Sequence, residues 1–158
     1  MALIHEKLYQ SEDLARINCA DYIHNLTSHL YRSYQVSPRN IKLQVNVDKI
    51  SLSLDAALPC GLIINELVSN ALKYAFPDKQ SGKIDINLNL DEQNHYILMV
   101  SDNGVGLPPN INWKNTQSLG LRLVRTLSQQ LGAKVELDRS HGTMFYLNFS
   151  EPNYKKRI

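Results

Sequence analysis

Three polar side chains that can bind a charged ligand recur along one apolar segment: Glu66, Asn70 and Lys73. Their spacing of four and then three residues places them on one face of a helix. Burying an acid, an amide and an ammonium without partners is costly, and a ligand carrying phosphates and Mg²⁺ would supply the partners. An amide oxygen suits a hard cation, and an ammonium suits phosphate. The alternative interpretation is the solvated edge of an amphipathic helix.

A second segment, residues 101–106 (SDNGVG), places a carboxylate at the end of an apolar strand and two glycines shortly after it. An ionised Asp102 only accepts hydrogen bonds, and it can accept one from an exocyclic amino group. Gly104 and Gly106 allow a sharp turn and the close approach of a flat ligand. The alternative is a turn in which Asp102 caps the loop.

Two later segments can contact the same ligand. Residues 118–124 (SLGLRLV) open a helix with a glycine, at the place where backbone N–H groups favour phosphate. A helix start that needs only a flexible residue is the alternative. Residues 141–149 (HGTMFYLNF) place Gly142 and Thr143 at the start of the last strand, where Thr143 can bond a ligand or only the sheet.

The helices that would position these residues follow from apolar residues three or four apart. Residues 1–36 are predicted to be helical, with Ser11 as a helix N-cap and an apolar stripe from Leu14 to Tyr34. Residues 55–76 and 119–131 are the other predicted helices, and Gly132 ends the last one.

Strict alternation of apolar and polar residues predicts the strands. They cover residues 41–47, a short extended piece at 50–54, a hairpin of 84–90 with 96–100, and closing strands at 135–137 and 144–149. Residues 103–117 show no periodicity, and a segment of this length is usually functional or mobile. Helices mixed with hairpins predict an α/β sandwich with helices on one face of a mixed sheet.

Composition excludes several classes of protein. The 158 residues suit one domain, and 17 basic against 15 acidic residues leave no basic stripe for nucleic acid or a membrane surface. The uncharged run at 56–64 is too short to cross a bilayer, and Glu6 interrupts any signal-peptide core. Cys19 and Cys60 match no metal or redox spacing. We therefore expect a cytoplasmic protein with reduced thiols, no nucleic-acid partner and no direct membrane contact.

The four segments, taken in order, resemble a known set of motifs. NELVSNALKYAF, SDNGVG, SLGLRLV and HGT resemble the N, G1, G2 and G3 boxes of the gyrase, heat-shock chaperone, histidine-kinase and MutL (GHKL) superfamily of ATP-binding domains, over about residues 55–150. Within it, the sequence is similar to the catalytic domain of a sensor histidine kinase of the HWE-related branch. The resemblance implies a two-layer α/β sandwich of the Bergerat type, with a mixed, largely antiparallel sheet and helices on one face.

The same resemblance implies a division of the chain. Residues 2–17 (ALIHEKLYQSEDLARI) are similar to the end of that branch's dimerisation region and its linker helix. We expect residues 1–36 to be a remnant of these elements, 37–151 to be the ATP-binding catalytic domain, and 152–158 to be a tail.

The resemblance also implies a role for each site residue. Asn70 would coordinate Mg²⁺ between the ATP phosphates, while Lys73 and Tyr74 would contact phosphate and ribose. Asp102 would accept a hydrogen bond from the adenine amino group, with Thr143 acting through a water. The remaining ATP-binding residues are those that shape the adenine pocket, begin the lid or meet the phosphates: Gly104, Gly106, Leu107, Ser118, Leu119, Gly120 and Leu121.

Three positions within the boxes need separate comment. Glu66 occupies the position of the acidic general base in the superfamily's ATPases, so it is the candidate catalytic residue. Ser118 replaces the first glycine of the usual second glycine box. The lid, residues 107–118, is short, and Trp113 is its candidate hydrophobic anchor.

The implied activity is transfer of the ATP γ-phosphoryl group to a histidine. The partners would be a phosphoacceptor helix, from an upstream segment or a second protomer, and a response regulator. His5 precedes Glu6, but the Asn or Thr and the Pro that usually follow an acceptor are absent, so we assign no acceptor in this chain. An anti-sigma-factor-like serine kinase and a non-catalytic ATP-sensing module are the alternative functions.

Overall fold

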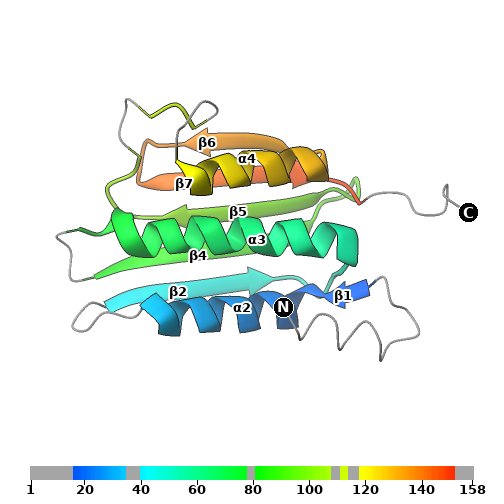
Figure 1. Ribbon diagram of the computed structural model, residues 1–158. Helices are drawn as coiled ribbons and strands as arrows, with labels where there is room; N and C mark the ends of the chain where they lie inside the picture. The colour runs from blue at the N-terminus through cyan, green and yellow to red at the C-terminus, as the bar shows by residue number, and fades with distance from the viewer. Residues whose placement is uncertain (1–15, 35–39, 78–80, 108–110, 114–117, 152–158) are drawn as a thin grey trace, which may run out of the picture.

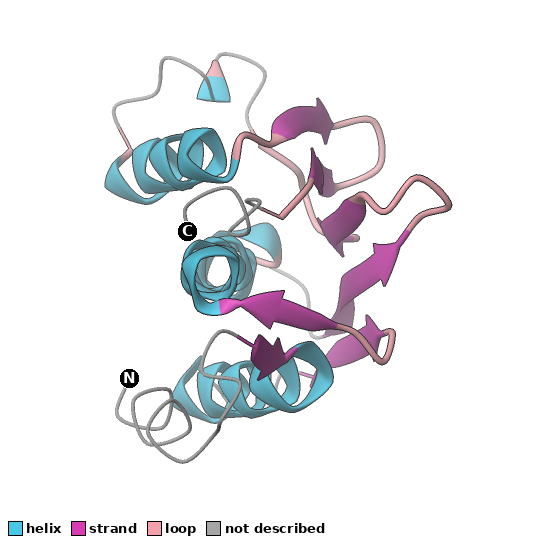
Figure 2. Ribbon diagram, turned by 90° about the vertical axis from the view of Figure 1, so that its right-hand side faces the viewer, coloured by secondary structure: helices cyan, strands magenta, loops and turns pink. Residues whose placement is uncertain are grey.

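The computed structural model describes residues 16–34, 40–77, 81–107, 111–113 and 118–151. They form two layers, a five-stranded sheet and helices that cover one of its faces (Figures 1 and 2). The strand order is β2-β4-β5-β7-β6, with β2 parallel to β4 and the other pairs antiparallel. The strands are β2 (Asn40–Val47), β4 (Ser81–Leu90), β5 (Tyr96–Asp102), β6 (Lys134–Asp138) and β7 (Thr143–Phe149). The predicted α/β sandwich is confirmed.

The core lies between the sheet and helix α3 (Leu54–Asn70), the most apolar helix. Alternation in β4 points Ile84, Ile86 and Leu88 to the helical side, and all three are 0% exposed. Ile64 and Val68 of α3 are equally buried. Burying each side chain of this size contributes about 1.5–3 kcal/mol. This packing fixes α3 along the sheet, and with it the polar residues at the end of the helix.

The prediction of one helix over residues 1–36 is wrong for Arg16–Asn18, the first residues that the structure describes. Residues Arg16–Asn18 form a strand, β1, that pairs antiparallel with β3 (Ser51–Ser53), and helix α2 begins only at Cys19 (Cys19–Tyr34). Ile17 pairs with Leu52, and both are buried, so the distant strand outweighs the helical periodicity. The Oδ1 atom of Asn18 accepts a hydrogen bond from the Asp21 N–H at 3.1 Å, which caps α2. Ser11 and Leu14 lie outside the described residues.

The helix predicted over residues 55–76 changes character near its end. It is α-helical through Asn70 and continues as a π-helix, η1 (Ala71–Ala75). The loop after β5 packs tightly on this turn, because the Val105 N–H donates to the Ala75 carbonyl at 2.8 Å. The wider π turn shifts the direction of every side chain after Asn70. It therefore alters the face that the sequence periodicity assigns to Lys73.

The remaining described elements agree with the predictions. β4 and β5 form the predicted hairpin, whose turn has the Asp91 carboxylate accepting from the N–H groups of Gln93 and His95 at 2.8 and 2.9 Å. Helix α4 (Leu119–Leu131) has the predicted bounds, and Gly132 ends it with a left-handed φ of 65°. The lid expected at 107–118 is described only in part. No helix among the described ranges is long and apolar enough to span a membrane.

Candidate functional site

A cavity of about 420 Å³ opens where β5 ends and β7 begins, between the end of α3 and the start of α4. This volume lies in the range of small-molecule binding sites. Most of the exposed lining is apolar, from Val100, Phe145 and neighbouring side chains. The cavity brings together eight of the predicted site residues: Asn70, Tyr74, Asp102, Gly106, Leu107, Ser118, Leu121 and Thr143.

Asp102 is the acidic residue that lines this cavity. It is the last residue of β5 and lies opposite Thr143 of β7. Burial raises the pKa of Asp102, and hydrogen bonds from the backbone N–H groups of Gly104 and Thr143 partly offset this rise. The Gly104 N–H donates to Oδ1 at 2.9 Å, which confirms that Asp102 caps the loop. Its carboxylate also lines the cavity, where an amino group of a ligand can reach it.

Glycines bring the two loops at this end into contact. Gly106 and Gly142 have left-handed φ angles of 76° and 79°. A Cβ on Gly142 would lie 2.1 Å from the carbonyl oxygen of Asp102. Gly104 does not line the cavity; a Cβ there would lie 2.1 Å from the carbonyl oxygen of Ala75. These glycines therefore shape the cavity wall through close backbone approach.

Glu66 and Asn70 face the first turn of α4. A Cβ on Gly120 would lie 2.8 Å from Glu66 Oε2 and 3.6 Å from Asn70 Nδ2, so a larger residue at this position would displace the Glu66 carboxylate. Asn70 lines the cavity, and Glu66 lies one helical turn before Asn70 in α3. The first N–H groups of an α-helix have no carbonyl partner within the helix, and they attract anions. Leu119, at the first position of α4, is 79% exposed.

Lys73 does not line the cavity. Its ammonium lies 5.3 Å from the centre of the Tyr34 ring at the end of α2. The expected stripe of three polar residues is therefore divided, with Glu66 and Asn70 facing Gly120 and Lys73 facing Tyr34. Tyr74 does line the cavity, although it is 67% exposed.

Trp113 is buried, as expected of an anchor. It is 7% exposed, and its ring meets Phe145 edge-on at 5.6 Å. Phe145 in turn lines the cavity, so this segment packs directly behind the cavity wall.

The sequence analysis missed the apolar lining of the cavity. Val100 lies two residues before Asp102, and Phe145 lies two residues after Thr143, so strand alternation places each on the same face as its polar neighbour. The two are also register partners across β5 and β7. The two-residue spacing from Asp102 and from Thr143 is visible in the sequence and could have identified both lining residues. The other lining residues not assigned from the sequence are Leu67, Ala71, Ala75, Ser101, Val105 and Ile111.

Among the described residues, no cluster of three His, Cys, Asp or Glu side chains could hold a metal ion. A cation in this cavity would have an amide oxygen, that of Asn70, as a ligand from α3. Mg²⁺ accepts such sites, because it keeps several waters and takes oxygens from bound phosphates. The donor set therefore fits Mg²⁺ that arrives with a phosphate ligand.

Comparisons with known proteins agree on one family. Residues 56–153 match the family described as histidine kinase-, DNA gyrase B- and HSP90-like ATPase, and residues 1–34 match one described as histidine kinase. Blue-light-activated histidine kinase 2 of Erythrobacter litoralis is 34% identical over 112 residues, 71% of this chain and 32% of that protein. Sensor histidine kinase PdtaS of Mycobacterium tuberculosis is 30% identical over 143 residues, 90% of this chain and 27% of that protein.

A solved structure shows the same fold. The histidine kinase domain of the Erythrobacter litoralis EL346 blue-light activated histidine kinase matches with a TM-score of 0.81 and 29% identity, covering 91% of this chain and 70% of that one. The chain spans less than a third of the length of the two curated relatives, 32% and 27%.

Proposed function

The chain belongs to the histidine kinase-, DNA gyrase B- and HSP90-like ATPase family, as a catalytic domain of the sensor histidine kinase type, and on this premise we propose that it binds Mg·ATP in the cavity and transfers the γ-phosphoryl group to a histidine. The observation that carries the proposal is the arrangement of polar and apolar groups around the cavity. A half-buried carboxylate, Asp102, lies among apolar walls, while Asn70 lines the side near the first turn of α4.

Asp102 is the group that recognises adenine. Its carboxylate accepts a hydrogen bond from the exocyclic amino group, and Thr143 supports this contact through a water. Guanine carries a carbonyl at the equivalent position, and two acceptors repel each other. The apolar walls bury the faces of the base, and the close backbone contacts at Gly104 and Gly106 leave room for it.

The phosphates lie toward α4. Asn70 would hold Mg²⁺, which would neutralise phosphate charge, and the N–H groups of Gly120 and Leu121 would bind phosphate oxygens at the helix N-terminus. Tyr74 contacts the ribose. Lys73 reaches a phosphate only by leaving the Tyr34 ring, a movement that a flexible four-carbon side chain allows.

The transfer step needs little covalent chemistry from the protein. A nitrogen of the acceptor imidazole attacks the γ-phosphorus, the bond to the β–γ bridging oxygen breaks, and ADP leaves. The imidazole proton would pass to a carboxylate, and Glu66, whose Oε2 faces Gly120 at the start of α4, is the candidate. The domain contributes by positioning the reactants and neutralising charge.

The acceptor comes from another segment or from a second protomer. None of the described histidines, His24, His29, His95 and His141, lines the cavity, and His24 lies in a groove between α2 and β2. His5 lies outside the described residues. A response regulator would then receive the phosphoryl group. The buried free thiols Cys19 and Cys60 support a reducing, cytoplasmic location for the domain.

Incubation with γ-labelled ATP tests this function. We expect the chain alone to bind ATP without labelling itself, and a separate helix carrying a histidine-kinase acceptor to gain label that acid destroys and base preserves. Asp102→Asn should strongly reduce this labelling at ATP concentrations below saturation. Acid-stable label on serine would favour a serine kinase, and binding without transfer to any acceptor would favour a sensing module. Acid-labile label on the chain that His5→Ala removes would identify His5 as the acceptor.

A further inference from the structure

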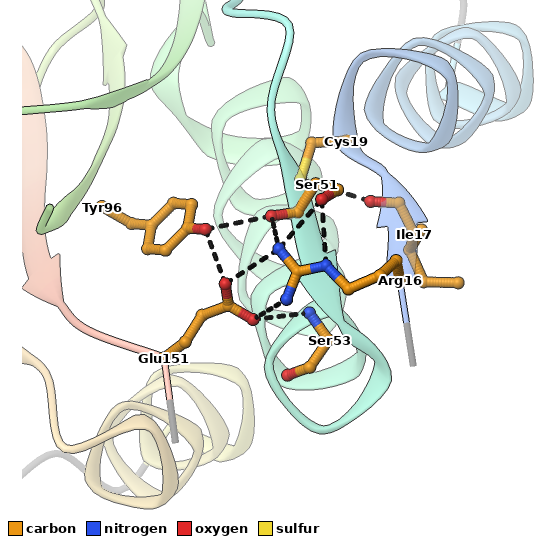
Figure 3. Close-up of polar contacts among 7 residues, drawn as sticks. All are labelled: Arg16, Ile17, Cys19, Ser51, Ser53, Tyr96 and Glu151. Atoms are coloured by element: carbon orange, nitrogen blue, oxygen red, sulfur yellow. Dashed lines mark hydrogen bonds and ion pairs between the residues drawn. The ribbon is translucent and has the colours of Figure 1, made fainter. Parts of the chain in front are cut away.

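The polar cluster drawn in Figure 3 includes Tyr96, the first residue of β5, whereas the cavity lies where β5 ends at Asp102. At the centre of the cluster, the Glu151 carboxylate accepts four hydrogen bonds. Arg16 donates from Nη1 to Oε2 at 2.7 Å and from Nη2 to Oε1 at 3.0 Å. The Tyr96 hydroxyl donates to Oε1 at 2.7 Å, and the Ser53 N–H donates to Oε2 at 2.8 Å. Each carboxylate oxygen therefore has both of its acceptor positions in use.

Arg16 is held on its other side as well. Its Nε donates to the Ser51 hydroxyl at 3.0 Å, and its Nη2 donates to the Ser51 carbonyl at 2.8 Å. The planar guanidinium makes these bonds and the bidentate pair with Glu151 at the same time, which an ammonium cannot do. The side chains of Arg16 and Glu151 are only 35% and 20% exposed. The cluster therefore fixes Arg16 in position and in orientation.

The cluster joins two parts of the chain that match different families. Arg16 belongs to β1, inside the segment 1–34, whereas Tyr96 and Glu151 belong to the ATPase segment 56–153. The backbone contact of β1 is a two-stranded pairing of three residue pairs with β3, which lies between the two matched segments and leads directly into α3. A two-stranded ribbon is marginally stable in water, so β1 also depends on the buried side chain of Ile17 and on the side-chain cluster around Arg16.

The same elements connect the cluster to the cavity. β5 runs from Tyr96 in the cluster to Asp102 in the cavity, a rise of roughly 20 Å. β7 pairs with it along this whole length, and the Tyr96 ring stacks on Phe149 at 5.5 Å. α3 begins directly after β3 and ends at Asn70 (Figure 1). The direction in which the chain leaves β1 is therefore set relative to the cavity through a rigid frame.

We propose that Arg16, Tyr96 and Glu151 form a joint that fixes the start of β1 on the catalytic domain, so that phosphoryl transfer to a histidine on a helix joined ahead of β1 depends on the joint. ATP binding does not depend on it, because the cavity is at the far end of β5. The inference rests on the proposed function. The three residues act as positioning residues, since a displacement of about 1 Å of a reacting group can reduce a rate a hundredfold.

The test compares an acceptor helix joined ahead of Met1 with the same helix added as a separate molecule. In Arg16→Met we expect the labelling rate of the joined acceptor to fall by about tenfold to a hundredfold. The rate for the separate acceptor and the Kd for Mg·ATP should stay within about twofold, because neither depends on β1. Arg32→Met, at an exposed position of α2, is the matched control.

A milder variant keeps the test valid if Arg16→Met impairs folding. Tyr96→Phe removes one hydroxyl and retains the ring that stacks on Phe149, so a smaller loss confined to the joined acceptor is expected. Amide exchange should accelerate at residues 16–18 in Arg16→Met and remain unchanged at residues 98–100, which shows that the opening is local.

The outcomes separate this inference from the function on which it rests. Equal losses for the joined and the separate acceptor, or no loss in either, would overturn the joint alone. An unaltered chain that labels neither acceptor would overturn the proposed function and the joint together.

Discussion

The ammonium of Lys73 lies 5.3 Å from the centre of the Tyr34 ring, so a cation–π contact ties η1 to the end of α2. Lys73 is the residue that the N box assigns to a phosphate, yet it faces away from the cavity. If Lys73 binds phosphate as the proposed function requires, it would have to leave this contact. Nucleotide binding and the contact with Tyr34 would then compete for one side chain.

This competition predicts the effect of removing the ring. An exposed cation–π contact contributes about 0.5–1 kcal/mol, so Tyr34→Leu should tighten Mg·ATP binding about two- to fivefold. Lys73→Met should weaken it, and Tyr34→Phe, which retains a ring, should change it little. Isothermal titration measures all three. If Tyr34→Leu weakens binding as much as Lys73→Met, the ring instead holds Lys73 ready for phosphate.

Asp102 should determine the choice of base. Asp102→Asn removes a charge-assisted hydrogen bond of about 1.5–3 kcal/mol and should weaken ATP binding ten- to a hundredfold. Glu66→Gln, the control in the same site, should leave affinity nearly unchanged, because a base for the transfer step need not stabilise bound ATP. Titration with ATP and GTP checks the preference. Equal affinities for the two nucleotides would contradict this role of Asp102.

The raised pKa of Asp102 adds a pH dependence. Burial stabilises the protonated carboxyl, which cannot accept the amino hydrogen bond at the protonated oxygen. As the pH falls, ATP affinity should therefore begin to fall at a higher pH than an ordinary aspartate pKa of 3.8 would allow. Affinity measured from neutral to acid pH gives this midpoint. A midpoint at or below the ordinary value would show that bound ATP outweighs the effect of burial.

Trp113 should report binding through Phe145. It is the only tryptophan of the chain, and its ring meets Phe145, which lines the cavity. Saturating Mg·ATP should shift its emission, because a nucleotide in the cavity changes the surroundings of Phe145 and of the indole packed against it. Asp102→Asn at the same ATP concentration is the control. An unchanged spectrum would contradict this link between the cavity and Trp113.

Gly132 and Gly142 both have left-handed backbone conformations, so they allow a matched test of the free energy of unfolding. A Cβ on Gly132 would meet nothing within 4 Å. In Gly132→Ala only the strain of the left-handed backbone should therefore reduce the free energy of unfolding, by about 1–2 kcal/mol. Gly142→Ala should cost about 2–4 kcal/mol, because its Cβ would also lie 2.1 Å from the Asp102 carbonyl oxygen. Urea unfolding compares the two variants. Equal losses would show that the Gly142 loop can move away from Asp102.

Glu151 should make the free energy of unfolding depend on pH in the acid range. Burial raises the pKa of this carboxyl, but hydrogen bonds from Arg16, Tyr96 and the Ser53 N–H outweigh burial and hold the pKa below its ordinary 4.5. The stabilisation is therefore present above about pH 4.5 and is lost as the pH falls through the lower pKa of the folded state. The difference in free energy of unfolding between the unaltered chain and Glu151→Gln should shrink from pH 7 to about pH 3.

Urea unfolding at several pH values measures this difference, with Glu92→Gln at an exposed turn position as the matched control. A difference that stays constant over the range would show that the bonds to Glu151 do not stabilise the fold.

The sequence by itself determined the elements whose causes are local. Alternation predicted the β4–β5 hairpin, and a terminal glycine predicted the end of α4, because both effects act within a few residues. The order of the four motifs indicated the ATP-binding family, which the comparisons confirm. Asn70 and Asp102 could be chosen as cavity residues because their chemistry and their places in these motifs are readable without a fold.

Only the tertiary structure decided the features that join distant segments. β1 is a strand because Ser51–Ser53 pairs with it, and the periodicity of residues 14–34 predicts a helix there. Lys73 turns to Tyr34 because η1 widens the helix where the β5 loop packs. Arg16 meets Glu151 across 135 residues. Such contacts depend on which segments the folded sheet brings together, and a local pattern of apolar residues carries no information about that.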